Sequence, residues 1–122
     1  KINLNKKNKK NKKNILILGL TFKEDCSDLR DSKVFNIIYT LKKKNCNIDV
    51  FDPWVNNKDL QKKITFKLIR KLKNKKYDAI ILAVAHSIFK KIGFEKINSL
   101  KKRNGFFYDV KSLFYGNNVE CL

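Results

Sequence analysis

Cationic and aromatic side chains gather in two stretches of the chain. The stretch "GLTFKEDCSDLRDS" (residues 19–32) contains Phe22, Lys23 and Arg30, and Lys111 ends the stretch "FYDVK". Lysine and arginine bind phosphate oxygens through charged hydrogen bonds, and an aromatic ring packs against the flat face of a base. These residue types are therefore suited to a phosphorylated ligand that carries a ring, such as a nucleotide.

Alternating strands and helices are expected to position these residues. The continuous apolar runs "ILILGL" and "YDAIILAVAH" are typical of strands that are buried on both faces of a sheet. The expected strands are residues 15–20, 47–53, 64–66, 77–86 and 105–111, and the expected helices are residues 33–43, 57–63, 67–74 and 87–102, the last interrupted near Gly93. Asp31 or Ser32 is expected to cap the first helix. The pattern predicts an α/β fold, a three-layer Rossmann-like domain with a parallel sheet and helices on both faces.

Ligands of open parallel sheets bind at the carboxyl ends of the strands. The stretch from Gly19 to Ser32, the "DPWV" that contains Trp54, the "AHS" after the fourth expected strand and the "DVK" after the last one all reach that edge. The start of the first helix adds backbone N–H donors and a positive dipole end. From the residues alone, the prediction is a parallel α/β domain with an edge that favours anions.

The formal charge of +18 and the pI of about 10.0 favour a second class, a stand-alone basic domain that binds nucleic acid or another polyanion. Lysine and arginine total 29, and only Arg30, Arg70 and Arg103 are arginines. Base-reading sites usually use the bidentate guanidinium of arginine, and the abundance of Lys, Asn and Ile is typical of A/T-rich codons. Specific nucleic-acid binding is therefore not expected, whereas weak, salt-sensitive adhesion to polyanions is.

The remaining features concern organisation and location. Residues 1–14 are Lys/Asn-rich and are expected to form a flexible linker, followed by one ligand-binding domain over residues 15–122. No Met is present, which suggests a piece of a longer protein or a processed product. The 3 cysteines form no CxxC motif, and we expect them to be reduced thiols. The sequence shows no apolar run long enough to span a membrane and no secretory signal. We therefore expect a cytoplasmic protein without membrane contact.

Four stretches in their order and spacing carry a family resemblance. "GLTFKEDCSDLRDSKV", "VFDPWV", "YDAIILAVAHSIF" and "FYDVK" resemble the C-terminal, UDP-sugar-binding domain of the UDP-glucose/GDP-mannose dehydrogenase family, from about Ile15 to Lys111. The residues of these motifs are similar to those of bacterial enzymes that act on UDP-N-acetylhexosamines for polysaccharide biosynthesis.

The resemblance implies an enzyme that oxidises the C6 alcohol of a UDP-sugar to a carboxylate in two hydride transfers to NAD, through a covalent intermediate on a cysteine. It further implies upstream NAD-binding and dimerisation domains, and thus a homo-oligomer in the intact enzyme. By motif position, Phe22 and Lys23 contact the substrate, Arg30 reaches the cofactor held by a neighbouring domain, and Lys111 replaces a substrate-directed arginine of many family members.

The chain also departs from what a complete enzyme needs. It contains no G-x-G-x-x-G turn for NAD, and the family's nucleophilic cysteine lies in a different motif from Cys26, so no catalytic residue is assigned and the chain alone is expected to be inactive. A structural role is expected for His86, for example in helix capping with Ser87, and no metal site is expected. A further alternative is the remnant of a decayed gene that binds nothing.

Overall fold

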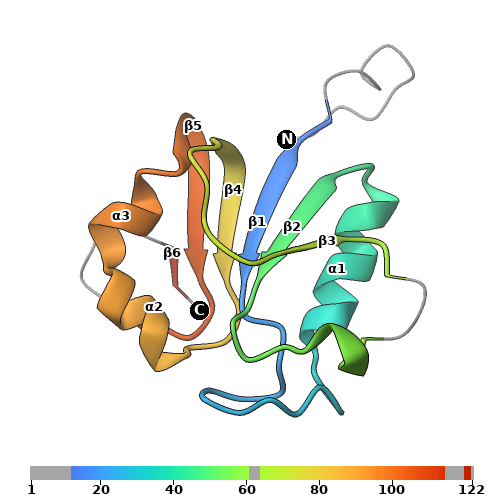
Figure 1. The fold of residues 1–122 in the computed structure, drawn as a ribbon. Helices are drawn as coiled ribbons and strands as arrows, with labels where there is room; N and C mark the ends of the chain where they lie inside the picture. The colour runs from blue at the N-terminus through green and yellow to red at the C-terminus, as the bar shows by residue number, and fades with distance from the viewer. Residues whose placement is uncertain (1–11, 61–63, 115–119, 122) are drawn as a thin grey trace.

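The structure is a computed structural model that describes residues 12–60, 64–114 and 120–121. Six parallel strands form one sheet in the order β3-β2-β1-β4-β5-β6 (Figure 1). The strands are β1 (Asn14–Leu18), β2 (Asn47–Phe51), β3 (Lys67–Ile69), β4 (Tyr77–Leu82), β5 (Lys101–Asp109) and β6 (Glu120–Cys121). All strands run the same way, so their carboxyl ends meet at one edge.

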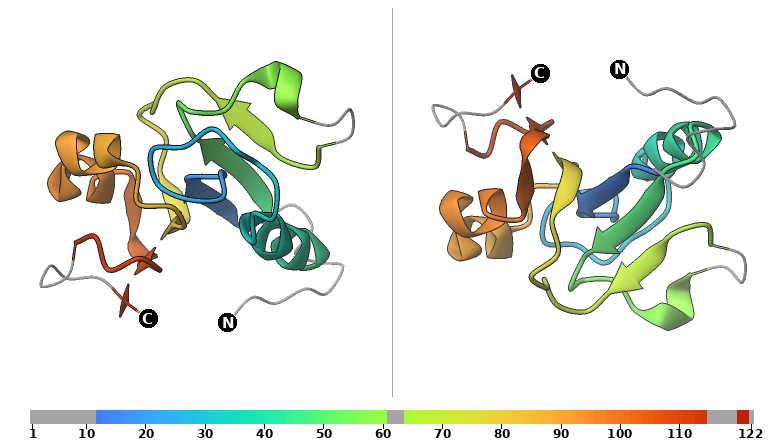
Figure 2. Two further views of the ribbon diagram at one scale, coloured as in Figure 1. Left: turned by 90° about the horizontal axis from the view of Figure 1, so that it is seen from below. Right: turned by 90° about the horizontal axis from the view of Figure 1, so that it is seen from above.

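Helices cover both faces of this sheet. Helix α1 (Val34–Lys43) lies on one face, and the short helices α2 (Ser87–Ile92) and α3 (Phe94–Asn98) lie on the other (Figure 2). The 3-10 turn η2 (Asn57–Asp59) follows β2. Among the described residues, no helix has the length and apolar character needed to cross a membrane.

The alternation of side chains along β1 divides the interior into two cores. Ile15 and Ile17 pack with Ile38 of α1, whereas Leu16 and Leu18 join the core under α2 and α3. Because β1 is buried on both sides, its sequence is continuously apolar. The predicted α/β class, with a parallel sheet between two helical layers, is confirmed.

Several local predictions were wrong. Residues 67–74 were expected to be helical and residues 64–66 a strand, but the third strand is Lys67–Ile69, an edge strand paired with β2. The helical segment predicted to reach residue 102 ends at Asn98, and Lys101 already begins β5. The two-residue strand β6 was not predicted. Of the residues expected to be helical in 57–63, residues 61–63 lie outside the described part.

The caps also differ from expectation. Lys33, not Asp31 or Ser32, occupies the N-cap position of α1. The hydroxyl of Ser32, one residue before the N-cap, accepts a hydrogen bond from the Val34 N–H at 3.2 Å. The Ser32 hydroxyl also donates to the carbonyl of Leu20 at 2.6 Å, which ties the end of the β1–α1 loop to its beginning.

Gly19 lets the chain leave β1 toward this loop. Its φ is +97°, and a Cβ at this position would lie 2.6 Å from Cβ of Val84. Glycine therefore serves both the backbone angle and the close approach of the segment after β4.

Candidate functional site

Three segments meet at the carboxyl edge of the central strands. Strands β2 and β4 flank β1, so the segments that follow them lie on either side of the β1–α1 loop, residues 19–33 (Figure 1). Asp52 follows β2, and His86 follows β4. Both side chains are buried against the loop, together with Thr21.

His86 is held through both ring nitrogens. Its Nδ1 accepts a hydrogen bond from the backbone N–H of Asp25 at 2.8 Å. An acceptor nitrogen carries no proton, so the neutral ring carries its proton on Nε2, which lies 2.9 Å from Oδ2 of Asp52. The imidazole is therefore a neutral link between the loop and Asp52.

Asp52 collects donors from three segments. Its Oδ2 accepts from the backbone N–H groups of Leu20 at 2.6 Å and Thr21 at 3.2 Å, and its Oδ1 accepts from the N–H of Trp54 at 2.8 Å. Burial acts to raise the pKa of Asp52, but the hydrogen bonds from His86, Leu20 and Trp54 outweigh it, so this pKa lies below its usual value. The carboxylate is thus a buried anion that is satisfied by its donors.

Phe22 and Lys23 project from this anchored loop into solvent. Phe22 is 50% exposed, and Lys23 is exposed as well. Their backbone is held locally, because the Phe22 N–H donates to the carbonyl of Asp28 at 2.7 Å and the Thr21 hydroxyl donates to the carbonyl of Lys23 at 3.1 Å. A neighbouring ring and ammonium group are therefore presented together from a fixed turn.

Asp25 connects the loop to α2. Its Oδ1 accepts from the backbone N–H of Ser87 at 2.9 Å and from the Ser87 hydroxyl at 3.2 Å. The Ser87 backbone N–H is the largest cause that lowers the pKa of Asp25 below its usual value. The expected capping by His86 and Ser87 is thus corrected: the loop carboxylate satisfies the start of α2, and His86 makes no side-chain cap bond there.

Arg30 lies on another part of the loop and binds the loop itself. Its Nε and one terminal nitrogen each lie 3.0 Å from an oxygen of Asp28, and its side chain is 87% exposed. The hydrogen bond from Arg30 is the largest cause that lowers the pKa of Asp28. The two charges neutralise each other at the surface.

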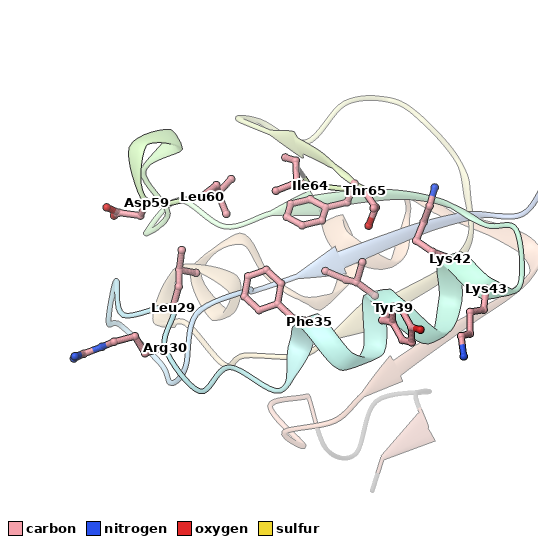
Figure 3. Close-up of a pocket in the computed structure, with 12 residues that line it drawn as sticks. Leu29, Arg30, Phe35, Tyr39, Lys42, Lys43, Asp59, Leu60, Ile64 and Thr65 are labelled. Atoms are coloured by element: carbon pink, nitrogen blue, oxygen red, sulfur yellow. The ribbon is translucent and has the colours of Figure 1, made fainter. Parts of the chain in front are cut away.

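An apolar groove of about 700 Å³ begins at Arg30. Figure 3 shows Arg30 and Asp59 at one end, Lys42 and Lys43 at the other, and the ring of Phe35 between them. The groove runs along α1, whereas Phe22 and Lys23 are not among the residues that line it. Arg30 thus borders a surface separate from that of the other predicted cations.

Lys111 follows β5 and is exposed. Strand β4 separates β5 from β1, which places the ends of β1 and β5 roughly 10 Å apart along the edge. Trp54 is 42% exposed, and its ring lies 6.1 Å from the ring of His86, so the indole covers the buried histidine. The structure thus places Phe22, Lys23, Trp54 and Lys111 along the carboxyl edge.

Thr21, His86 and Asp52 are not arranged as a catalytic relay. Thr21 and Asp52 both approach Nε2 of His86, whereas a nucleophile–base–acid relay needs them on opposite ring nitrogens. The partly exposed thiol of Cys26 is contacted by the N–H of Asp28 at 3.5 Å. Among the described residues, no group of three potential metal ligands is found.

The β1–α1 loop differs from the loop that binds a dinucleotide in Rossmann domains. Between β1 and α1 lie fifteen residues with Gly19 as the only glycine, so no glycine-rich turn brings the helix start to a pyrophosphate. Only Arg30 remains as a predicted contact to a cofactor held elsewhere.

The buried set of Asp52, His86 and Thr21 was not predicted as a unit. A signal was present, because Asp52 directly follows β2 and His86 ends the apolar run that continues from β4. What linked them was the strand order, which puts β2 and β4 on either side of β1.

Comparison with known proteins identifies a family. Residues 16–115 match the UDP-glucose/GDP-mannose dehydrogenase family, UDP binding domain. The UDP-N-acetyl-D-glucosamine 6-dehydrogenase of Pseudomonas aeruginosa is 46% identical over 99 residues, which are 81% of this chain and 24% of that protein. The enzyme of the same name from Salmonella typhi is 39% identical over 98 residues, which are 80% of this chain and 23% of that protein.

A solved structure shows the same fold. The structure of the UDP-D-ManNAc dehydrogenase from Pyrococcus horikoshii superposes with a TM-score of 0.64 at 20% identity, covering 90% of this chain and 25% of that one. The chain therefore spans about a quarter of the length of the relatives it matches.

Proposed function

Because the chain belongs to the UDP-glucose/GDP-mannose dehydrogenase family through its UDP binding domain, we propose that it binds the nucleotide part of a UDP-sugar at the carboxyl edge of its sheet. The observation that carries this proposal is the exposed pair Phe22 and Lys23 on a turn whose backbone is anchored from beneath. An aromatic ring and an ammonium group on a held backbone offer a flat apolar face and a phosphate partner, and the backbone adds little ordering cost on binding.

In this proposal Phe22 and Lys23 contact the nucleotide-sugar, and Lys111 adds a second cation further along the edge. Two of the four carboxylates of the loop have partners within the protein. Asp28 is paired with Arg30, and Asp25 is engaged with the start of α2.

For the intact protein we propose an NAD-dependent UDP-sugar 6-dehydrogenase that oxidises the C6 alcohol to a carboxylate in two hydride transfers. The relatives that are UDP-N-acetyl-D-glucosamine 6-dehydrogenases favour a UDP-N-acetylhexosamine as the substrate. Binding energy from the remote nucleotide would orient C6 for reaction and help to exclude water. Upstream domains would hold NAD and supply the nucleophile, and Arg30 would reach the bound NAD. The intact protein would form a homo-oligomer in the cytoplasm through these domains. The chain alone would be inactive.

Calorimetric titration of the chain with UDP and UDP-N-acetylglucosamine tests the proposal. A salt concentration of about 150 mM damps nonspecific charge effects, and ATP and a short RNA serve as competitors for the same charge. Lys23→Ala removes the proposed phosphate partner. Lys13→Ala is the matched control, because Lys13 is an exposed lysine just before β1, at the opposite edge of the sheet.

We expect selective binding of the uridine nucleotides that weakens at least tenfold in Lys23→Ala and is retained in Lys13→Ala. Equal binding of every polyanion, with the same response to both substitutions, would instead support the rival class, a basic domain that adheres through its charge of +18. An absence of binding to any of these ligands would count against a nucleotide site in this chain.

A further inference from the structure

His86 and Asp52 form a buried polar link between the β1–α1 loop and the segments that follow the two neighbouring strands. His86 is 0% exposed and Asp52 is 1% exposed. Because neither side chain reaches the surface, neither can touch a ligand at the edge. Burying a carboxylate costs desolvation free energy, and apolar residues at the same positions would avoid that cost. We therefore ask which groups the pair binds.

The pair holds both ends of one short span. Before the span, the N–H groups of Leu20 and Thr21 donate to Asp52. After it, the N–H of Asp25 donates to His86. Only residues 22–24 lie between these two anchors, and they include both side chains proposed to meet the nucleotide.

The geometry of the second anchor is unusual. Asp25 has a φ of +53°, a left-handed conformation that a non-glycine residue seldom adopts without support. The hydrogen bond to Nδ1 of His86 and the bonds from Ser87 to the Asp25 carboxylate support it from two sides. If the imidazole acceptor is lost, the Asp25 backbone N–H loses its hydrogen-bond partner and the turn loses one of these supports.

We propose that His86 and Asp52 are positioning residues: as a buried, neutral-imidazole link they fix the span 22–24 so that Phe22 and Lys23 are presented together to the ligand. The inference rests on the proposed nucleotide binding for its functional consequence, and on the hydrogen bonds alone for its structural part. The packing around the ring agrees with a fixed orientation, since the rings of Trp54 and Phe89 lie 6.1 Å and 5.5 Å from the imidazole.

Two amide substitutions separate the functions of the two ring nitrogens. In His86→Asn the side-chain oxygen can take the place of Nδ1 and accept from Asp25, whereas in His86→Gln the side-chain nitrogen can take the place of Nε2 and donate to Asp52. Tyr77→Phe is the control for general loss of stability, because it removes a buried hydrogen bond to Asp49 at the other edge of the sheet. Thr21→Val, which removes a hydroxyl that donates to the Lys23 carbonyl and lies 3.2 Å from Nε2 of His86, serves if His86→Gln does not fold.

Backbone ¹⁵N relaxation and hydrogen exchange measure the span directly. We expect residues 22–24 and the Asp25 amide to be ordered and protected in the wild type and in Tyr77→Phe, and mobile and unprotected in His86→Gln. His86→Asn is expected to restore much of the order. Since the chain has one histidine, its imidazole ¹⁵N spectrum needs no assignment, and it should show an unprotonated Nδ1.

Affinity for UDP, measured well below the unfolding midpoint of each variant, completes the test. We expect His86→Gln to bind at least tenfold more weakly than the wild type, His86→Asn to recover most of this loss, and Tyr77→Phe to bind as the wild type does. An ordered span in His86→Gln or Thr21→Val, a proton on Nδ1, or unchanged affinity in His86→Gln would overturn the proposal. If the wild type does not bind UDP while the span still loosens in His86→Gln, the nucleotide function fails and the positioning of the span stands.

Discussion

Arg30 is paired with Asp28, two residues earlier in the same loop, through two side-chain contacts of 3.0 Å each. The resemblance assigned Arg30 to a cofactor in a neighbouring domain, and that role stays a prediction. In this structure the guanidinium is exposed at the end of the groove along α1 and points away from the loop core (Figure 3). It is available to a partner that could replace Asp28.

Replacing Asp28 by Ala should therefore release the Arg30 side chain. The Nε of Arg30 is expected to be ordered in the wild type and to gain mobility in Asp28→Ala, as seen by ¹⁵N relaxation of the arginine side chains. Asp31→Ala is the control, because Asp31 acts on Arg30 only through its charge. Equal order of Arg30 in all three proteins would contradict the assigned pairing.

Lys111 should contribute to UDP affinity through its positive charge and not through a specific arrangement of donors. We expect Lys111→Ala to weaken UDP binding severalfold and Lys111→Arg to retain or improve it, because the guanidinium offers a fork of donors to phosphate oxygens. Calorimetric titration of both variants at one salt concentration measures this. A loss of affinity in Lys111→Arg as large as that in Lys111→Ala would show that shape, not charge, matters at this position.

The strands with the clearest signal in the sequence are β1 and β4, at the centre of the sheet. Both are mainly apolar because helices cover both faces of the sheet, so the sequence itself carries the signal. Strand β3 is a three-residue edge strand, and the apolar spacing of Leu68, Ile69 and Leu72 reads equally well as a helix turn. Its strand conformation depends on pairing with β2, a contact that no local pattern reveals.

The candidate site also contains residues that the sequence could predict and residues that it could not. Phe22 and Lys23 could be singled out by residue type and by their place after a strand. The network beneath them could not, because Thr21, Asp52 and His86 come from three segments that are brought together by strand order. A lone histidine in the sequence has many possible roles, and only the distances show that both its nitrogens are used.

The two described glycines with positive φ, Gly19 and Gly93, should respond differently to alanine. At Gly19 a Cβ would lie 2.6 Å from Cβ of Val84, whereas at Gly93 a Cβ would meet nothing within 4 Å. We expect Gly19→Ala to lower the free energy of unfolding by about 3 kcal/mol or more, because strain and overpacking add. Gly93→Ala should cost about 2 kcal/mol from backbone conformation alone, because φ +93° with ψ +151° lies in a region that essentially only glycine adopts. Urea unfolding compares them, and equal losses would contradict the close packing at Gly19.

Tyr77 anchors the amino end of β4. It is 1% exposed, and its hydroxyl donates to Asp49 at 2.7 Å, while Lys75 binds the same carboxylate oxygen at 3.2 Å. Tyr77→Phe removes the donor but leaves the ion pair, so the free energy of unfolding should fall by about 1.5 kcal/mol. Tyr39→Phe, at an exposed tyrosine, should change it little.

Alkaline titration gives a second signature of Tyr77. Burial, followed by the hydrogen bond to Asp49, raises the pKa of Tyr77 well above its usual value. A raised pKa in the folded state means that the stabilisation is present below about pH 10, the unfolded value, and is lost as the pH rises beyond it. The wild type should therefore approach the stability of Tyr77→Phe under strongly alkaline conditions, and a constant difference would contradict the buried bond.

Asp52 should dominate the loss of stability in acid. Its pKa is lower in the folded state than in the unfolded chain, so its stabilisation is present above about pH 4 and is lost as the pH falls further. Asp52→Asn leaves an amide that cannot accept from every donor around it, and at neutral pH it should lower the free energy of unfolding by about 3 kcal/mol. Between about pH 7 and about pH 3 the wild type should lose more stability than Asp52→Asn, and urea unfolding at each pH measures both slopes. Asp59→Asn, at an exposed residue, is the control that should follow the wild type. Parallel slopes for the wild type and Asp52→Asn would mean that other carboxylates, such as Asp25 and Asp28, carry the acid response.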